Sequence, residues 1–409
     1  MIDARDQIER LVGFENRQAG TDAERRAAND LAAQLRGLDR DAEVEPIVVR
    51  PRWYIAHLIH ALLAIAGSAI SVNNALAGTI LVAVAAIATI GDITGRLPIT
   101  RLITGRRASQ NVVSTERTSR PGTLILSAHY DTARGGAAYG KTDELRAALG
   151  HRLKRPIGPA EPFAWSILLL LAATIARLAG LDGPLLSAVQ FVPTVVLIVS
   201  LPYLADVALS GAVPGANDNA SGVATVLRLA ERYGETLDHL DVWLVFTGAQ
   251  EPGALGMTAW LRRHKGELDP ESTIVLNVDE VGHGTIRYAT KEGPLTAPRQ
   301  HRQLTSLCDQ IAEEDAGEGR YGARPVTARH PGDAYAARAR GIPAITISTA
   351  GALDRAPHHH RPADTPDQID DQALDRAFRF CSELIELIDE RIGPEIAAAA
   401  DERASFTPS

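Results

Sequence analysis

Residues 215–233 read GANDNASGVATVLRLAERY and form the most specific segment of the chain. A glycine-rich turn carries Asp218, and a helical pattern follows directly. A carboxylate on such a turn can bridge two metal ions through its two oxygens. The same turn is also explained by Asn219, Ser221 and Gly222 acting only as turn and capping residues. The segment therefore indicates a metal site only if other ligands lie elsewhere in the chain.

Three other segments end a strand-like run with an acidic or imidazole side chain. They are LILSAHYDT (124–132), VFTGAQEPGALGM (245–257) and VLNVDEVG (275–282). Their candidate metal ligands are His129, Glu251 and Asp279. Asp131 lies two residues after His129 and points the same way in an extended segment, so we expect it to steady the site. Each segment alone is equally well explained as a polar strand end.

The last candidate ligand lies in HHHRPADTPDQID (358–370), where His360 stands four residues before Asp364. Its neighbours His358 and His359 compete with it, because position alone does not separate three consecutive histidines. The combined set of imidazole and carboxylate side chains suits Zn²⁺ or a similar divalent ion. Two such ions would clamp a water nucleophile and polarise a carbonyl group.

The soluble sequence predicts an α/β fold with a three-layer sandwich around a mainly parallel sheet, because strand-like and helical patterns alternate. The strand-like runs are 110–114, 123–128, 241–247, 273–278 and 343–348. The helical patterns are 220–233, 254–265, 299–314, 333–340 and 370–392. Residues 3–37 also predict a helix, in which Thr21-Asp-Ala-Glu24 is a capping box for a second section.

Two apolar blocks interrupt this pattern. The first contains runs at 53–72 and 75–94, and the second contains runs at 163–181 and 185–209. Each pair predicts a transmembrane helical hairpin with a short turn, because the runs have spanning length and few charges. Four buried helices of a large soluble core are the alternative. His57 and His60 are polar exceptions that we expect at the interface or against a partner helix.

The residues that flank the apolar runs predict the orientation in the membrane. Arginines and lysines stand before and after the hairpins, whereas the two turns carry almost no positive charge. The positive-inside rule then puts both termini and the soluble segments in the cytoplasm, with membrane lipid as a partner. The expected organisation is one soluble unit, two inserted hairpins and a tail. The soluble parts are 1–52, 97–162 and 210–395, the hairpins are 53–96 and 163–209, and the flexible tail is 396–409.

Composition excludes several other classes of protein. The 409-residue chain has a net charge of -8 and no basic tract with interleaved aromatic residues, which argues against a nucleic-acid partner. Cys308 and Cys381 are its two cysteines, and their spacing excludes a disulfide framework and a cysteine-ligated zinc site. The first residues lack an apolar core, so no cleavable signal peptide is expected.

These motifs, in this order, resemble the di-zinc aminopeptidase and glutamate-carboxypeptidase group, peptidase family M28. The resemblance covers most of the soluble sequence, including RQAGTDAERRAANDLAAQL (17–35) and the GD…RGIPAITIS segment (332–348). It implies that one zinc ion is held by His129, Asp218 and Asp279, and the other by Asp218, Glu251 and His360. It further implies supporting roles for Asp131 and Asp364. Asp333 matches the aspartate of a Ser-Asp pair in which Gly332 replaces the serine.

The main departure from the family is Gln250, which occupies the position of the catalytic glutamate. A glutamine cannot accept a proton near neutral pH, and general-base catalysis is worth about 10²–10⁴-fold. Glu280 is a possible substitute base, although its sequence position alone does not bring it to the site. Met257 is a second departure, because it replaces a small residue.

The sequence therefore favours a membrane-anchored zinc exopeptidase, an aminopeptidase that hydrolyses peptides with a water activated by two metals. The alternative is a catalytically weakened metal-binding pseudo-peptidase or scaffold, which Gln250 motivates. A third hypothesis within the same fold is cyclisation of N-terminal glutamine.

Overall fold

The computed structural model describes residues 2–115 and 120–406. Its centre is an eight-stranded sheet of order β1-β2-β4-β3-β5-β8-β6-β7. The strands are β1 (Glu43–Val49), β2 (Arg107–Ser114), β3 (Gly122–His129), β4 (Leu240–Thr247), β5 (Thr273–Val278), β6 (Thr285–Glu292), β7 (Arg324–Ala328) and β8 (Ala344–Ala350). The central order β4-β3-β5-β8 is parallel throughout, whereas β1-β2, β2-β4 and β6-β8 are antiparallel. The sheet is thus mixed and mostly parallel.

Helices cover both faces of the sheet. The helices outside the apolar blocks, of which all but α5 belong to the sheet domain, are α1 (Ala4–Val12), α2 (Asp22–Gly37), α5 (Lys141–Arg152), α8 (Ser221–Tyr233), α9 (Leu255–Arg263), α10 (Arg302–Glu314), α11 (Asp333–Arg338), α12 (Asp371–Arg391) and α13 (Gly393–Phe406). Neighbouring residues of β3 show the two layers, since Leu124 belongs to the core that includes residues of α1, α2, α8, α10 and α12, while Ile125 belongs to the core that includes residues of α9 and α11. Met257 is fully buried in the second layer, where it fills space beside Trp260.

Three strands were not predicted from the sequence, and each omission has a physical reason. The edge strand β1 contains Pro46, which is tolerated there because one side of the strand needs no hydrogen bonds. The opposite edge strand β7 is short and largely exposed. The strand β6, TIRYATKE, is rich in polar residues although it is mostly buried. None of the three gives a clean apolar run.

The C-terminal end of the described chain is helical. Helix α13 extends to Phe406, where the sequence suggested a loose tail from residue 396, and Ile396 is buried in the core. Residues 407–409 of that expected tail lie outside the described residues.

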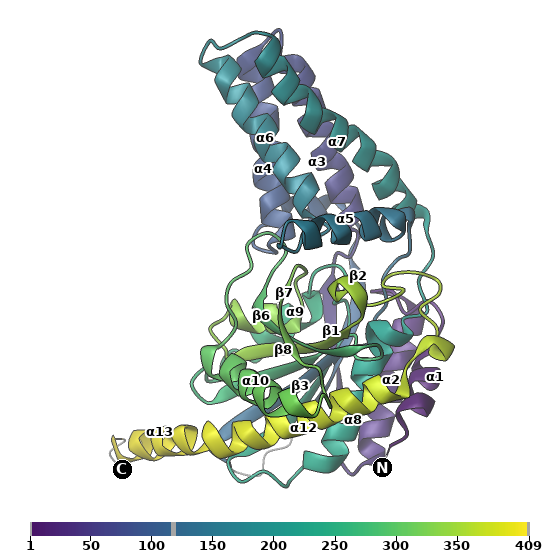
Figure 1. Cartoon of the computed structure of the whole chain (residues 1–409), viewed down its shortest axis with the longest axis vertical. Helices are drawn as coiled ribbons and strands as arrows, with labels where there is room; N and C mark the ends of the chain where they lie inside the picture. The colour runs from purple at the N-terminus through teal and green to yellow at the C-terminus, as the bar shows by residue number, and fades with distance from the viewer. Residues whose placement is uncertain (1, 116–119, 407–409) are drawn as a thin grey trace.

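The four apolar runs form helices α3 (Trp53–Ser71), α4 (Ala75–Ile93), α6 (Glu161–Leu178) and α7 (Pro184–Leu209). All four are long and apolar enough to cross a membrane. They pack into a bundle that projects from the sheet domain, with α5 lying across its base (Figure 1). The bundle has its own apolar core, built from residues such as Ala61, Val82, Ile167 and Leu197. The partial burial of these helices therefore comes largely from contacts with one another.

Polar groups at the foot of the bundle join it to the sheet domain. The guanidinium group of Arg101 donates to both carboxylate oxygens of Asp92 at 2.8 Å each, and His57 lies 3.3 Å from the same carboxylate. The third arginine nitrogen donates to the carbonyl of Pro252 at 2.7 Å. His60 Nε2 lies 2.7 Å from Thr100 Oγ1. Both histidines thus contact neighbouring polar groups at the base of the bundle.

Candidate metal centre

The carboxyl ends of three adjacent parallel strands supply most of the site. His129 ends β3, Glu251 follows β4 and Asp279 follows β5. Because β3 pairs with both β4 and β5, these ends meet at the same edge of the sheet. Asp218 comes from the kinked turn Ala216–Ala220 before α8, and His360 comes from the loop between β8 and α12.

The carboxylate of Asp218 lies at the centre of the site. Its Oδ1 is 3.2 Å from His129 Nε2, which is also 3.4 Å from Asp279 Oδ1. Its Oδ2 is 3.1 Å from His360 Nε2, which is 3.2 Å from Glu251 Oε2. The structure thus brings all five sequence-derived candidate ligands together, with the two Asp218 oxygens facing two separate groups.

The three consecutive histidines differ in their surroundings. The rings of His359 and His360 stack with centroids 3.8 Å apart, and His359 Nδ1 lies 3.3 Å from Asp218 Oδ2. The same nitrogen is 2.8 Å from Glu280 Oε1. His360 alone of this pair also contacts Glu251 among the described residues. His360 therefore fits the second group better, while Glu280 is engaged with His359.

Two buried carboxylates hold the backbone of the ligand loops. Asp131 accepts from the backbone N–H groups of Gln250 at 2.9 Å and Glu251 at 3.2 Å. Asp364 accepts from the N–H groups of Asn217 at 2.7 Å and Asp218 at 3.1 Å. Both aspartates therefore support the site chiefly by fixing the peptide groups that carry its side chains.

The polar residues around Asp218 do more than form a turn. Asn219 Oδ1 accepts from the N–H groups of Gly222 and Glu280, both at 3.0 Å. Asn217 Oδ1 accepts from Gly282 N–H at 2.7 Å, and Ser221 Oγ accepts from Val281 N–H at 3.0 Å. These bonds tie the turn to the loop after Asp279. The sequence showed only local turn chemistry here, because long-range partners leave no local signal.

The protonation of the site follows from its crowded acids and imidazoles. Burial alone would lower the pKa of His129, but hydrogen bonds with Asp131, Asp218 and Asp279 raise it well above its usual value. Burial likewise opposes protonation of His360, yet the charge of Glu251 raises the pKa of this residue to about 9. Hydrogen bonds from the surrounding histidines overcome burial and hold the pKa of Asp218 well below its usual value. In the absence of a metal cation, the positive charge of the imidazolium groups therefore neutralises part of the negative charge of the carboxylates.

The donor set fits a pair of divalent cations. Among the described residues, Glu251 Oε1 and His360 Nδ1 are buried without a hydrogen-bond partner, while Asp218 Oδ2 and Asp279 Oδ1 face only imidazole nitrogens, at 3.1 to 3.4 Å. Buried polar atoms are normally satisfied, so such a concentration at one place calls for a missing partner. Imidazole nitrogens and carboxylate oxygens are the ligands that Zn²⁺ accepts. Two groups of residues offer such ligand atoms close together, His129-Asp218-Asp279 and Asp218-His359-His360.

Gln250 and Asp333 lie beside the ligands. The Gln250 side chain is mostly buried and donates to the carbonyl of Pro331 at 3.3 Å. Asp333 Oδ2 accepts from Thr247 Oγ1 at 2.6 Å, while its Oδ1 is buried without a partner, and burial raises its pKa to about 7. A side chain at Gly332 would put its Cβ 2.6 Å from Glu292 Oε1. That close approach explains why glycine precedes Asp333.

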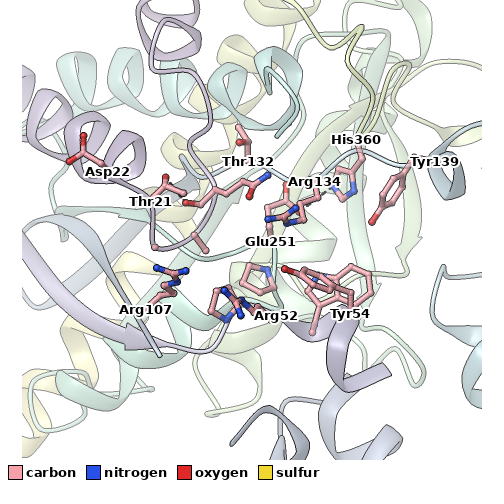
Figure 2. A pocket seen from close by; sticks show the side chains of 17 residues that line it. Thr21, Asp22, Arg52, Tyr54, Arg107, Thr132, Arg134, Tyr139, Glu251 and His360 are labelled. Carbon is pink, nitrogen blue, oxygen red and sulfur yellow. Dashed lines mark hydrogen bonds and ion pairs between the residues drawn. The ribbon is translucent and has the colours of Figure 1, made fainter. Parts of the chain in front are cut away.

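A pocket of about 370 Å³ opens beside the site. Glu251, Pro252, Tyr139 and His360 line one part of it, and residues from the start of α3 line another. Figure 2 shows His360 and Tyr139 on one side of this space, with Arg52 and Arg107 on the other. The candidate ligands are therefore open to a small molecule.

Comparison with solved structures shows the same fold in two zinc-dependent peptidases and in a glutaminyl cyclase. A zinc aminopeptidase from Bacillus subtilis matches with a TM-score of 0.54 and 13% identity, covering 93% of each chain. A Zn-dependent exopeptidase from Parabacteroides distasonis matches with a TM-score of 0.52 and 14% identity, over 95% of this chain and 97% of that one. A glutaminyl cyclase from Tannerella forsythia matches with a TM-score of 0.53 and 16% identity, over 94% and 97%.

Comparison by sequence gives one family and no individual relative. No curated protein matches the chain. The model of peptidase family M28 matches residues 200–385, a range that contains Asp218, Glu251, Asp279 and His360. The family match, the zinc aminopeptidase fold and the convergence of the candidate ligands agree, and over residues 200–385 the chain is similar to peptidase family M28.

Proposed function

We propose that this chain is a membrane-anchored exopeptidase that binds two zinc ions and hydrolyses the terminal peptide bond of its substrates, as an aminopeptidase. The observation that carries this proposal is the position of Asp218 between two ligand groups, with its two oxygens 3.2 Å from His129 and 3.1 Å from His360. A carboxylate in this position can bridge two cations.

Each ligand group has a defined role in the proposal. One cation would be held by His129, Asp218 and Asp279, and the other by Asp218, Glu251 and His360. Two zinc ions would polarise the scissile carbonyl and lower the pKa of an attacking water. Asp131 and Asp364 fix the position of the ligand loops by accepting hydrogen bonds from their backbone N–H groups. The pocket beside Glu251 and His360 receives the substrate.

Gln250 changes which group can accept the proton of the attacking water. Its amide can orient a water by hydrogen bonds, but it cannot take the proton as the corresponding glutamate would. Asp333 is a buried carboxylate with a free oxygen and a pKa of about 7, which suits a group that accepts a proton near neutral pH. We infer that turnover is slower than in an enzyme with the usual glutamate, and that Asp333 is the first substitute to examine.

A metal-binding protein without hydrolytic activity is the second candidate, because Gln250 removes the usual base. Its ligand set would then stabilise the fold or present the pocket to a bound peptide. The two functions differ in one measurable property, which is turnover by the wild-type chain.

We also infer that α3, α4, α6 and α7 cross a membrane as two hairpins, with the sheet domain in the cytoplasm. Large apolar side chains on the outside of the bundle support this inference. They include Leu62, Ile80, Val84, Ile87, Leu169, Leu185, Phe191, Val192 and Val199, each more than a third exposed. Such a surface would be unstable in water but is stable in lipid.

The test is hydrolysis of a panel of aminoacyl substrates by detergent-purified protein with added Zn²⁺. Wild type is assayed beside Gln250→Glu, with His129→Ala as the control for loss of the metal. We expect chelator-sensitive turnover in wild type and about 10²–10⁴-fold faster turnover in Gln250→Glu. Turnover that appears only in Gln250→Glu would instead support the non-hydrolytic candidate.

A further inference from the structure

The pocket beside the candidate ligands has an unexpected basic end. Arg52 and Arg107 line it together with Glu251 and His360, and they lie on the far side of the space in Figure 2. Neither guanidinium group has an ion-pair or hydrogen-bond partner among residues 2–115 and 120–406. Two free cationic groups facing one small cavity point to an anionic ligand.

The position of Arg107 is built into the fold. It is the first residue of β2, and the backbone of Gly20 packs directly on its side chain. A Cβ at Gly20 would lie 2.4 Å from Arg107 Cβ, and the φ of +78° at Gly20 disfavours any other residue. The loop before α2 therefore packs on the base of the Arg107 side chain, which lines the pocket and is exposed to solvent. Arg52 immediately precedes α3, so the first apolar helix fixes the position of its backbone.

Thr132 is a separate sign of a missing ligand in the same pocket. It is only 2% exposed, and its Oγ1 is buried without a hydrogen-bond partner. It follows Asp131, so it lies one residue from a group that supports Glu251. A hydroxyl buried in this way costs free energy unless a ligand supplies a partner. A carboxylate oxygen would accept its proton in a hydrogen bond.

The other charged groups of the pocket are already engaged. Arg134 donates to the carbonyl groups of Ala208 and Ser210 and lies over the ring of Tyr54. The carboxylate of Asp22 is paired with two arginines of its own helix. The free charge away from the candidate ligands is therefore positive.

We propose that Arg52, Arg107 and Thr132 form a subsite for the carboxylate of a short peptide, so that the preferred substrates are dipeptides and tripeptides with a free C-terminus. The proposal rests on the proposed peptidase function, because the scissile bond must lie at Glu251 and His360 while the carboxylate reaches the arginines. A pocket of about 370 Å³ suits a ligand of this size. A phosphate of a membrane lipid has similar charge, but the shared lining with Glu251 and His360 favours a substrate group.

The test compares Ala-Ala with Ala-Ala amide as substrates of zinc-loaded protein in nanodiscs. Both contain the same scissile bond, and only one carries the carboxylate. We expect wild type to prefer the free acid by about 10–100-fold in kcat/KM, as charge-assisted hydrogen bonds to a carboxylate imply. The double variant Arg52→Gln/Arg107→Gln should abolish the preference, so that kcat/KM for the free acid falls to that for the amide measured in the same variant. Arg106→Gln is the matched control, since this neighbouring arginine is exposed like Arg107 but does not line the pocket.

The outcomes separate this subsite from the peptidase function. Hydrolysis of both substrates at equal rates would overturn the subsite and leave the peptidase function standing. If neither substrate is hydrolysed, calorimetric titration with the same two compounds decides. Tighter binding of the free acid that depends on Arg107 would support the subsite without hydrolysis, whereas equal binding would overturn it. An acid preference that is unchanged in the double variant would also overturn the subsite and leave the arginines available to another anion, such as a lipid phosphate.

Discussion

At the scale of single residues, the site is defined by charges that compensate one another. Three carboxylates and two imidazoles lie close together. In the metal-free protein, the protonated imidazoles neutralise part of the negative charge of the carboxylates. This arrangement couples metal binding to pH, because a ligand nitrogen must lose its proton before it binds zinc.

Zinc binding should therefore release protons. The raised pKa values of His129 and His360, the latter about 9, mean that both imidazoles carry a proton near pH 7 in the metal-free protein. Binding then releases protons at pH 7, and apparent zinc affinity rises as the pH rises toward 9. Calorimetry in two buffers of different ionisation enthalpy measures the number released. A release that does not fall in His360→Ala would contradict this assignment.

Asp131 offers a second test at the same scale. It holds the N–H groups of Gln250 and Glu251, so Asp131→Asn replaces one acceptor oxygen with a donor that faces a backbone N–H. Loss of such supporting bonds usually weakens metal affinity about 10–100-fold. A competition assay against a zinc-binding dye gives this ratio. Asp375→Asn is the control, because this exposed aspartate lies on α12 with Arg228. Unchanged zinc affinity in Asp131→Asn would show that Asp131 does not support the metal site.

At the scale of elements, one side chain connects the apolar bundle with the metal-site loop. Arg101 binds Asp92 of α4 and the carbonyl of Pro252, the residue directly after Glu251. Both charged side chains are buried, so neither can exchange its partner for water.

Removing that arginine should destabilise the protein strongly. Arg101→Met leaves Asp92 buried without its main partner, at a cost of about 3–5 kcal/mol. The double variant Asp92→Asn/Arg101→Met should recover part of the loss, because no charge remains unpaired. Thermal unfolding in detergent measures both. Equal midpoints for the single and double variants would show that the unpaired Asp92 charge is not what destabilises Arg101→Met.

The strands and helices also differ in how well the sequence predicted them. The strands that carry His129, Glu251 and Asp279 were predicted because buried parallel strands give continuous apolar runs. The four apolar helices were predicted by their length. Strands β1, β6 and β7 were missed because their stability comes from pairing partners distant in the sequence. The choice among three histidines also needed the fold, since only distance to Asp218 and Glu251 separates them.

At the scale of the whole molecule, the apolar bundle and the sheet domain have different surfaces. The exposed outside of the bundle is apolar, and α5 lies across its base with Leu145, Leu149 and Leu153 exposed along the chain. Basic residues stand beside these leucines, as expected for a segment at a lipid surface. The shape therefore suits the proposed arrangement, in which the sheet domain lies against one face of a membrane.

Thiol labelling can test that orientation. The two native cysteines are buried, so an introduced thiol should be the reactive one. Asn73→Cys puts a thiol in the first hairpin turn, and Lys265→Cys puts one on the exposed surface of the sheet domain. We expect an impermeant maleimide to label the first variant in intact cells and the second only after permeabilisation. The reverse pattern would invert the orientation.

The most direct test of the whole account is the zinc content of the purified protein, measured by mass spectrometry for wild type and Asp218→Asn. Asp218 is the residue shared by both ligand groups, and asparagine keeps its shape while removing the charge. The account predicts about two zinc ions per wild-type chain and a loss of both in the variant. Zinc binding that is absent in wild type, or unchanged by Asp218→Asn, would contradict it.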